Sequence, residues 1–97
     1  MKPVRAHLII EGLVQGVFYR ANTVEAARRI GVYGFVKNRP DGAVEAVIEG
    51  DEEKVNKLIQ WCRIGPEIAR VEKVTVTWEE YRNEFDDFTA LTRYNSY

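Results

Sequence analysis

The chain has 97 residues, of which 45% are hydrophobic and 30% charged, and its formal net charge is -1. This length and composition are typical of one globular domain and exclude a disordered or fibrous chain, and the balanced charge argues against a dedicated nucleic-acid binder. A single histidine and a single cysteine cannot form a zinc or transition-metal cluster, and no apolar stretch reaches the length of a signal sequence or a membrane span. We therefore expect one cytoplasmic domain over residues 1–97.

The N-terminal third predicts a strand followed by a helix. Apolar side chains alternate over residues 4–11, which indicates a half-buried strand that ends at Gly12. After a loop over residues 13–19, apolar residues recur at helical spacing until Gly31, a favourable C-terminal stop. The residues of this predicted helical stripe are Ala21, Val24, Ala27 and Ile30.

The middle of the chain predicts a β-hairpin and a second helix. Residues 32–38 and 43–49 are expected as two strands joined by a turn that contains Pro-Asp-Gly. Asp51 is placed to cap the following helix, and Gly65 with Pro66 ends it. The apolar stripe of this helix consists of Val55, Leu58, Ile59 and Cys62.

The C-terminal third predicts one alternating strand over residues 73–78 and a short fifth strand over residues 88–94. In the last segment Leu91 breaks the expected alternation, so its register is open. The complete element order is βαββαβ with this short extra strand. We therefore expect an α+β fold of the ferredoxin-like type, a sandwich in which two helices cover one face of an antiparallel-rich sheet.

Residues 12–20, with the sequence GLVQGVFYR, lie between the first predicted strand and the first predicted helix. A glycine-containing turn can direct successive backbone N–H groups into one concavity, and a helix N-terminus adds partial positive charge. Arg20 supplies a planar fork that matches two phosphate oxygens. Such turns and surface arginines are common, so this stretch alone favours an ordinary surface loop over a phosphate site.

Asn38 ends the second predicted strand. A strand, helix, strand crossover returns the second strand parallel to the first, so both strands end at the same edge of the sheet. Asn38 is therefore predicted to face the loop of residues 15–20, where its amide could hold a water molecule in line with a bound phosphorus atom. Taken alone, the position favours the more common role of a turn-initiating asparagine that bonds its own backbone.

Together, the two stretches resemble the two signatures of the acylphosphatase family. The first is GLVQGVFYR at residues 12–20, and the second is GFVKN at residues 34–38, followed by Gly42, Val44 and Gly50. Later landmarks such as Trp61 also resemble the family, so the likeness covers nearly the whole chain. The resemblance implies the ferredoxin-like fold and a metal-independent hydrolase without a cofactor, which converts acyl phosphates into a carboxylate and inorganic phosphate.

The resemblance also implies the roles of particular residues. The catalytic pair is Arg20, which binds the phosphoryl group, and Asn38, which orients the attacking water. The expected phosphate-binding residues are Gln15, Gly16, Val17, Phe18, Tyr19 and Arg20. Because the leaving carboxylate is the base of an acid with a pKa of about 4, no general acid is needed. The expected partner is a small acyl phosphate bound by a monomer, with no nucleic-acid or membrane partner.

Two other classes of protein share this element order. RNA-recognition motifs have an aromatic strand motif that YGFV at residues 33–36 partly matches, but here it lies on the second strand instead of the third. The other class is a phosphate-binding or regulatory domain within a larger protein, over which this short chain favours a free-standing enzyme. His7 is expected to be an exposed structural residue and Cys62 a small buried hydrophobe.

Overall fold

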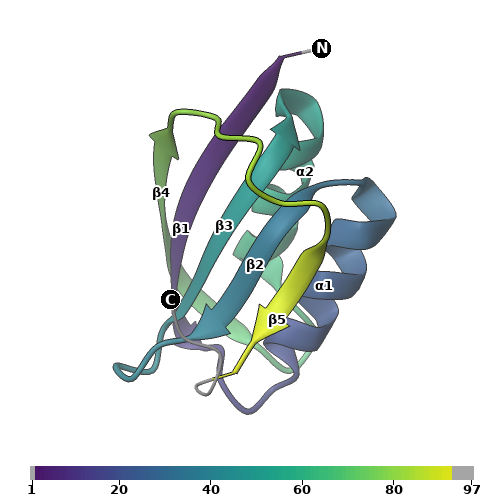
Figure 1. Ribbon diagram of the computed structural model, residues 1–97. Coiled ribbons are helices and arrows are strands. Elements are labelled where there is room, and N and C mark those ends of the chain that lie inside the picture. The colour runs from purple at the N-terminus through teal and green to yellow at the C-terminus, as the bar shows by residue number, and fades with distance from the viewer. Residues whose placement is uncertain (1, 93–97) are drawn as a thin grey trace.

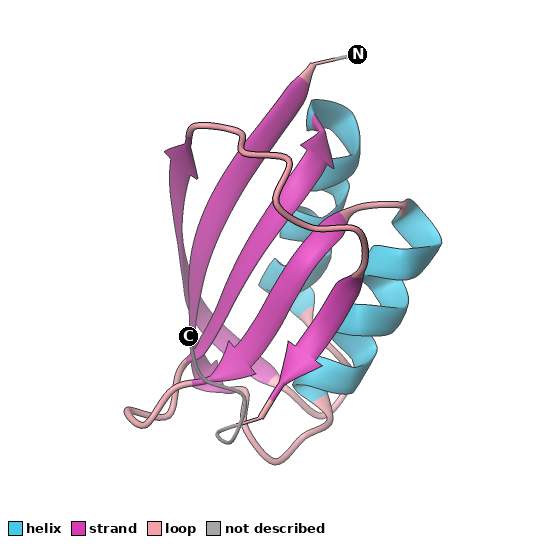
Figure 2. Cartoon of the chain, in the orientation of Figure 1, coloured by secondary structure: helices cyan, strands magenta, loops and turns pink. Residues whose placement is uncertain are grey.

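The computed structural model describes residues 2–92, which form a sheet of five strands covered on one face by two helices (Figures 1 and 2). The elements in chain order are β1 (Pro3–Leu13), α1 (Tyr19–Ile30), β2 (Tyr33–Asn38), β3 (Val44–Asp51), α2 (Glu52–Ile64), β4 (Arg70–Glu79) and β5 (Phe88–Leu91). The strand order is β4-β1-β3-β2-β5, and β2 with β5 is the parallel pair in an otherwise antiparallel sheet. The predicted ferredoxin-like fold and its short fifth strand are confirmed. Neither α1 nor α2 has the length and apolar character that crossing a membrane requires.

The main core lies between the sheet and the two helices. The even-numbered residues of β1 point into it, and the predicted stripe of α2 is buried, including Cys62. On α1 the buried face is rotated from the predicted one, because Ala21 is exposed and Tyr19 is almost fully buried. The physical reason is that α1 begins at Tyr19, whose large ring occupies the core and sets the face that the helix buries. The buried residues of α1 are Tyr19, Thr23, Ala26 and Ala27.

Two local expectations are wrong. β1 does not end at Gly12 but continues through a bulge, where a side chain would overlap the carbonyl oxygen of Arg70 on β4. Glycine therefore permits the close approach of β4 and does not stop the strand. Asp51 does occupy the N-cap of α2 but makes no side-chain capping hydrogen bond. Instead, the N–H of Glu52 donates to the carbonyl oxygen of Lys2.

A charge cluster fixes the connection between β4 and β5 on the open face of the sheet, the face away from the helices. Arg5 donates to carboxylate oxygens of Glu49, Glu79 and Glu84 at 3.1, 2.9 and 2.8 Å. Burial alone would raise the pKa of Glu49, but hydrogen bonds from the N–H groups of Arg82 and Glu84 and from Arg5 outweigh it and hold the pKa below its ordinary value. The cluster anchors the connection as it crosses this face (Figure 1), and β5 then lies beside β2.

β5 follows strand alternation with two buried side chains on opposite faces. Phe88 belongs to the main core, whereas Leu91 packs on the open face against Phe35 and Val47. Leu91 departs from the apolar alternation of the sequence because it packs in this separate apolar cluster. The register that the sequence leaves open is given by the pairing with β2, in which Leu91 lies opposite Lys37. Residues 93 and 94 of the predicted strand lie outside the described residues.

Candidate active site

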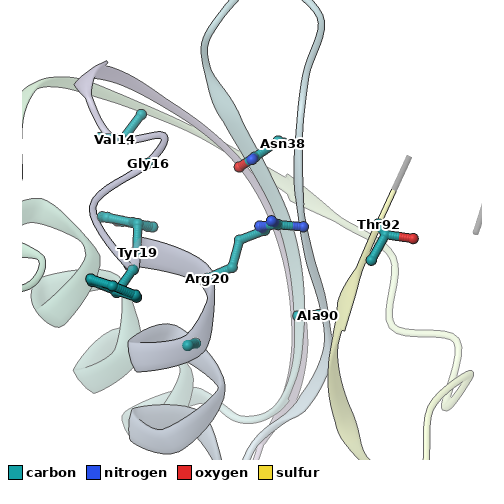
Figure 3. Close-up of a pocket in the computed structure, with 9 residues that line it drawn as sticks. Val14, Gly16, Tyr19, Arg20, Asn38, Ala90 and Thr92 are labelled. Atoms are coloured by element: carbon teal, nitrogen blue, oxygen red, sulfur yellow. The ribbon is translucent and has the colours of Figure 1, made fainter. Parts of the chain in front are cut away.

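The loop after β1, the first turn of α1 and the ends of β2 and β5 enclose a hollow of about 400 Å³ (Figure 3). Small-molecule sites in proteins commonly have volumes of about 300–1,000 Å³. β1 and β2 end at the same edge of the sheet (Figure 1), as the crossover argument predicts, so the loop and Asn38 meet there. The hollow is lined by Val14, Gly16, Phe18, Tyr19, Arg20, Ala21, Asn38, Ala90 and Thr92.

The loop before α1 presents backbone N–H groups that have no acceptor among the described residues. Gly16 and Phe18 have φ angles of 75° and 61°, and residues in this left-handed region let neighbouring N–H groups converge on one side of the chain. Within residues 2–92, no protein group accepts a hydrogen bond from the backbone N–H of residues 15–21. The first turn of α1 also carries no acidic side chain. The loop and the helix N-terminus are therefore suited to an anion such as phosphate.

Arg20 projects from the first turn of α1 toward Asn38 (Figure 3). Its Nη1 atom donates to the carbonyl oxygen of Leu91 on β5 at 2.8 Å. Among the described residues, no carboxylate forms an ion pair with this guanidinium, although four other arginines of the chain have such partners. A guanidinium carries five N–H donors in a fixed plane. One donor holds the side chain in place and leaves the charge available to a ligand.

Asn38 brings a buried polar atom to the hollow. Its Oδ1 atom is buried and has no hydrogen-bond partner within the described part of the chain. A buried acceptor without a partner costs about 1–3 kcal/mol, so proteins seldom retain one that no ligand or water completes. The amide lies at the end of β2 beside the guanidinium of Arg20 (Figure 3). The pair can therefore place a positive charge and a hydrogen-bond acceptor on the same small ligand.

Tyr19 lines the hollow, but its hydroxyl is engaged elsewhere. The hydroxyl donates to the carbonyl oxygen of Cys62 at 2.7 Å. The centroids of the Tyr19 and Trp61 rings are 5.7 Å apart. Burial raises the pKa of the Tyr19 hydroxyl far above its ordinary value and raises the pKa of the Cys62 thiol to about 12. Both groups are therefore neutral at physiological pH and serve to fix α1 against α2.

Two of the predicted phosphate-binding residues do not line the hollow. The side chain of Val17 belongs to the core, and the amide nitrogen of Gln15 donates to the carbonyl oxygens of Arg39 and Ala43, each at 2.8 Å. Gln15 thus ties the loop to the turn that follows Asn38. The predicted residues that do meet in the hollow are Gly16, Phe18, Tyr19, Arg20 and Asn38.

Replacing Gln15 by alanine is expected to lower the free energy of unfolding by roughly 1–3 kcal/mol, because two hydrogen bonds are lost at about 0.5–1.5 kcal/mol each. Urea denaturation of the variant and the wild type measures the difference. Gln60, an exposed residue of α2, supplies the matched control, since Gln60→Ala removes an amide that makes no such bonds. Equal stability of the Gln15 variant and the control would show that this tie contributes nothing.

β5 and the residue after it, Thr92, supply parts of the hollow that we do not predict from the sequence. Ala90 and Thr92 line it, and the carbonyl oxygen of Leu91 anchors Arg20. A backbone carbonyl has no sequence signature, and small side chains give no chemical signal. The parallel pairing of β5 with β2 that places these atoms joins segments about fifty residues apart.

The described part of the chain places no group of metal ligands at the hollow. Over residues 2–92, the histidine, cysteine, aspartate and glutamate side chains form no cluster of three that could hold a metal ion. His7 lies on β1 between residues that face the core, so it points to the open face, where Nε2 lies 2.6 Å from Oε2 of Glu45. It is half-buried and paired, and so less exposed than predicted, and it does not belong to the hollow.

Comparison with known proteins connects this geometry to a family. The model of the acylphosphatase family matches residues 6–90. The chain belongs to the acylphosphatase family. An acylphosphatase of Pyrobaculum islandicum is 56% identical over 92 residues, which cover 94% of this chain and 97% of the relative. The loop, Arg20 and Asn38 thus lie within the part of the chain that the acylphosphatase model matches.

Solved structures support the same family and its fold. The crystal structure of acylphosphatase from Bacillus subtilis has a TM-score of 0.87 and 28% identity, and the match covers 91% of this chain and 98% of that one. HypF of Thermococcus kodakarensis matches with a TM-score of 0.79 and 26% identity, covering 91% of this chain but only 12% of HypF. The acylphosphatase fold therefore occurs both as a chain of this length and as one part of a much longer chain.

Proposed function

We propose that this member of the acylphosphatase family hydrolyses the carboxyl-phosphate bond of acyl phosphates in the hollow between α1, β2 and β5. The observation that carries the proposal is the buried Oδ1 atom of Asn38, which has no partner among the described residues and lies beside the guanidinium of Arg20. The family membership supports the same reaction. The products are a carboxylate and inorganic phosphate.

Phosphate binding is assigned to the loop and to Arg20. The N–H groups of residues 15–21 have no acceptors within the described chain, and they can donate to the phosphoryl oxygens at the positive end of α1. Arg20, held by the carbonyl oxygen of Leu91, adds charge-assisted hydrogen bonds. In a loose phosphoryl-transfer transition state the equatorial oxygens keep most of the negative charge, so these donors stabilise the state that limits the rate.

Asn38 is assigned to the attacking water. Its Oδ1 atom can accept a hydrogen bond from that water and hold its oxygen in line with the phosphorus. A new bond then forms between water oxygen and phosphorus while the bond from phosphorus to the acyl oxygen breaks, and its electron pair leaves with the carboxylate. The water proton passes to a phosphoryl oxygen. Because the carboxylate is a weak base, departure requires no protonation by a side chain.

Hydrolysis of benzoyl phosphate by the purified wild-type protein in the presence of EDTA tests this function. We expect turnover that the chelator does not reduce, since binding and water positioning are assigned to the chain's own donors and amide. A correctly folded protein that binds phosphate but turns over no acyl phosphate would overturn the proposal. That outcome would favour a phosphate-binding or regulatory domain instead of an enzyme.

The proposal extends to a single-domain monomer in the cytoplasm that binds neither nucleic acid nor membranes. The nearly balanced formal charge of -1 supports it, because a nucleic-acid site usually carries a marked positive excess. Sedimentation equilibrium should give the mass of one chain, 11.2 kDa. Titration with single-stranded RNA should show no salt-sensitive binding, and such binding would reopen the RNA-recognition alternative.

A further inference from the structure

Phe18 combines a strained backbone with an uncovered side chain. Its φ and ψ angles of 61° and 25° lie in the left-handed region, which bulky L-residues rarely adopt. Its ring is 72% exposed, so packing within the described structure does little to offset this strain. Glycine, as at position 16, would hold a left-handed φ at less cost. The ring itself therefore needs an explanation, and residues of this kind gather at ligand clamps.

Phe18 lines the hollow together with other apolar residues. Phe18 and Ala21 are three residues apart, so they present neighbouring positions at the start of α1, and Ala90 of β5 also lines the hollow. All three residues are exposed, although each is apolar. They differ in character from the polar residues Arg20, Asn38 and Thr92, which line the same hollow. The lining is therefore divided into a polar part and an apolar part.

An acyl phosphate has the same division. Its phosphoryl group is anionic, whereas its acyl chain is largely apolar. In an in-line displacement the leaving carboxylate departs on the side opposite the attacking water, so the acyl chain extends away from the amide of Asn38. Phe18, Ala21 and Ala90 carry the exposed apolar side chains of the lining, and these can contact the acyl chain.

We propose that Phe18, Ala21 and Ala90 form a subsite for the acyl group, and that Phe18 makes the protein favour aromatic acyl phosphates over acetyl phosphate. This inference rests on the proposed function, because it assigns the second half of the same substrate. An aromatic ring in the acyl group would pack on the exposed ring of Phe18 and reduce the water contact of both. An acetyl group is too small to cover that ring.

Two phosphonates that cannot be hydrolysed test the subsite by binding alone. Phenacylphosphonate and acetonylphosphonate replace the bridging oxygen of benzoyl phosphate and acetyl phosphate with a methylene group. Calorimetric titration of the wild type should give a Kd for phenacylphosphonate about fivefold lower than that for acetonylphosphonate, the scale of an aromatic pair. Equal Kd values for the two phosphonates would overturn the inference.

Variants at position 18 connect this preference to the ring. In Phe18→Asn and Phe18→Gly, which tolerate a left-handed φ, the ratio of the two Kd values should fall close to one. Phe18→Tyr keeps the ring and should keep the ratio. Tyr33→Ala is the matched control, because Tyr33 is an exposed aromatic residue outside the hollow, and it should also keep the ratio. A ratio that survives in both ringless variants would contradict the role of Phe18.

The proposed function and the subsite can fail separately. A preference for phenacylphosphonate that depends on Phe18, in a wild-type protein that hydrolyses no acyl phosphate, would overturn the function and leave the subsite intact. Hydrolysis of benzoyl phosphate together with equal Kd values for the two phosphonates would overturn the subsite alone.

Discussion

Replacing Arg20 by alanine is expected to weaken competitive inhibition by inorganic phosphate strongly. A charge-assisted contact contributes about 1.5–3 kcal/mol, which corresponds to an inhibition constant roughly 10- to 100-fold higher in the variant. The guanidinium is held by the carbonyl oxygen of Leu91, so it is already oriented when the anion arrives. Steady-state inhibition of benzoyl phosphate hydrolysis, or direct calorimetric titration with phosphate, measures the change.

Two further variants separate the geometry of Arg20 from its charge. Arg20→Lys keeps the charge but loses the planar fork, so its inhibition constant should lie between those of the wild type and Arg20→Ala. Arg29→Ala removes an exposed arginine from the last turn of the same helix and should bind phosphate like the wild type. An inhibition constant that is unchanged in Arg20→Ala would remove Arg20 from the site.

Replacing Asn38 by alanine is expected to lower kcat by ~100-fold or more while phosphate still binds. This is the scale observed when one preorganised polar group is removed from an active site. Since Oδ1 is buried without a partner in the described structure, its removal should leave the free energy of unfolding equal or higher. Stopped-time assays of kcat, phosphate inhibition and urea denaturation measure the three quantities on one preparation.

A substitution that adds a negative charge at position 38 provides a second test of the site. Asn38→Asp has nearly the same shape, but its carboxylate repels the phosphoryl group, so this variant should lose phosphate affinity as well as kcat. Asn56→Ala removes an exposed asparagine of α2 and serves as the matched control. Wild-type turnover by Asn38→Ala would refute the role of the amide in holding water.

The sequence predicts the fold well where hydrophobic periodicity is strong. The alternation in β1 and the stripe of α2 each match one buried face. Both patterns arise because apolar side chains recur wherever the strand or helix faces the core. It predicts less well where one large side chain decides the geometry. Tyr19 starts α1 and turns the buried face away from Ala21, a choice that depends on space between α1 and α2 and not on the local pattern.

The sequence also predicts that the loop of residues 15–20 lies near Asn38, because a crossover connection places the ends of β1 and β2 at one edge of the sheet. The sequence does not predict in which direction the side chains of the loop point. Gln15 lies in the middle of the signature, yet its amide bonds the turn after Asn38 and not the hollow. The anchor of Arg20 is a backbone carbonyl of β5, and the position of that strand depends on long-range packing and on the Arg5 cluster.

The most direct test of the central claim is a single turnover of benzoyl phosphate by excess wild-type protein in ¹⁸O-labelled water, with mass analysis of both products. We expect the label to enter inorganic phosphate and benzoate to remain unlabelled, because water held by Asn38 attacks phosphorus. Label in benzoate would mean that water attacks the carbonyl carbon, and it would contradict the assignment of the hollow as a site of phosphoryl transfer to water.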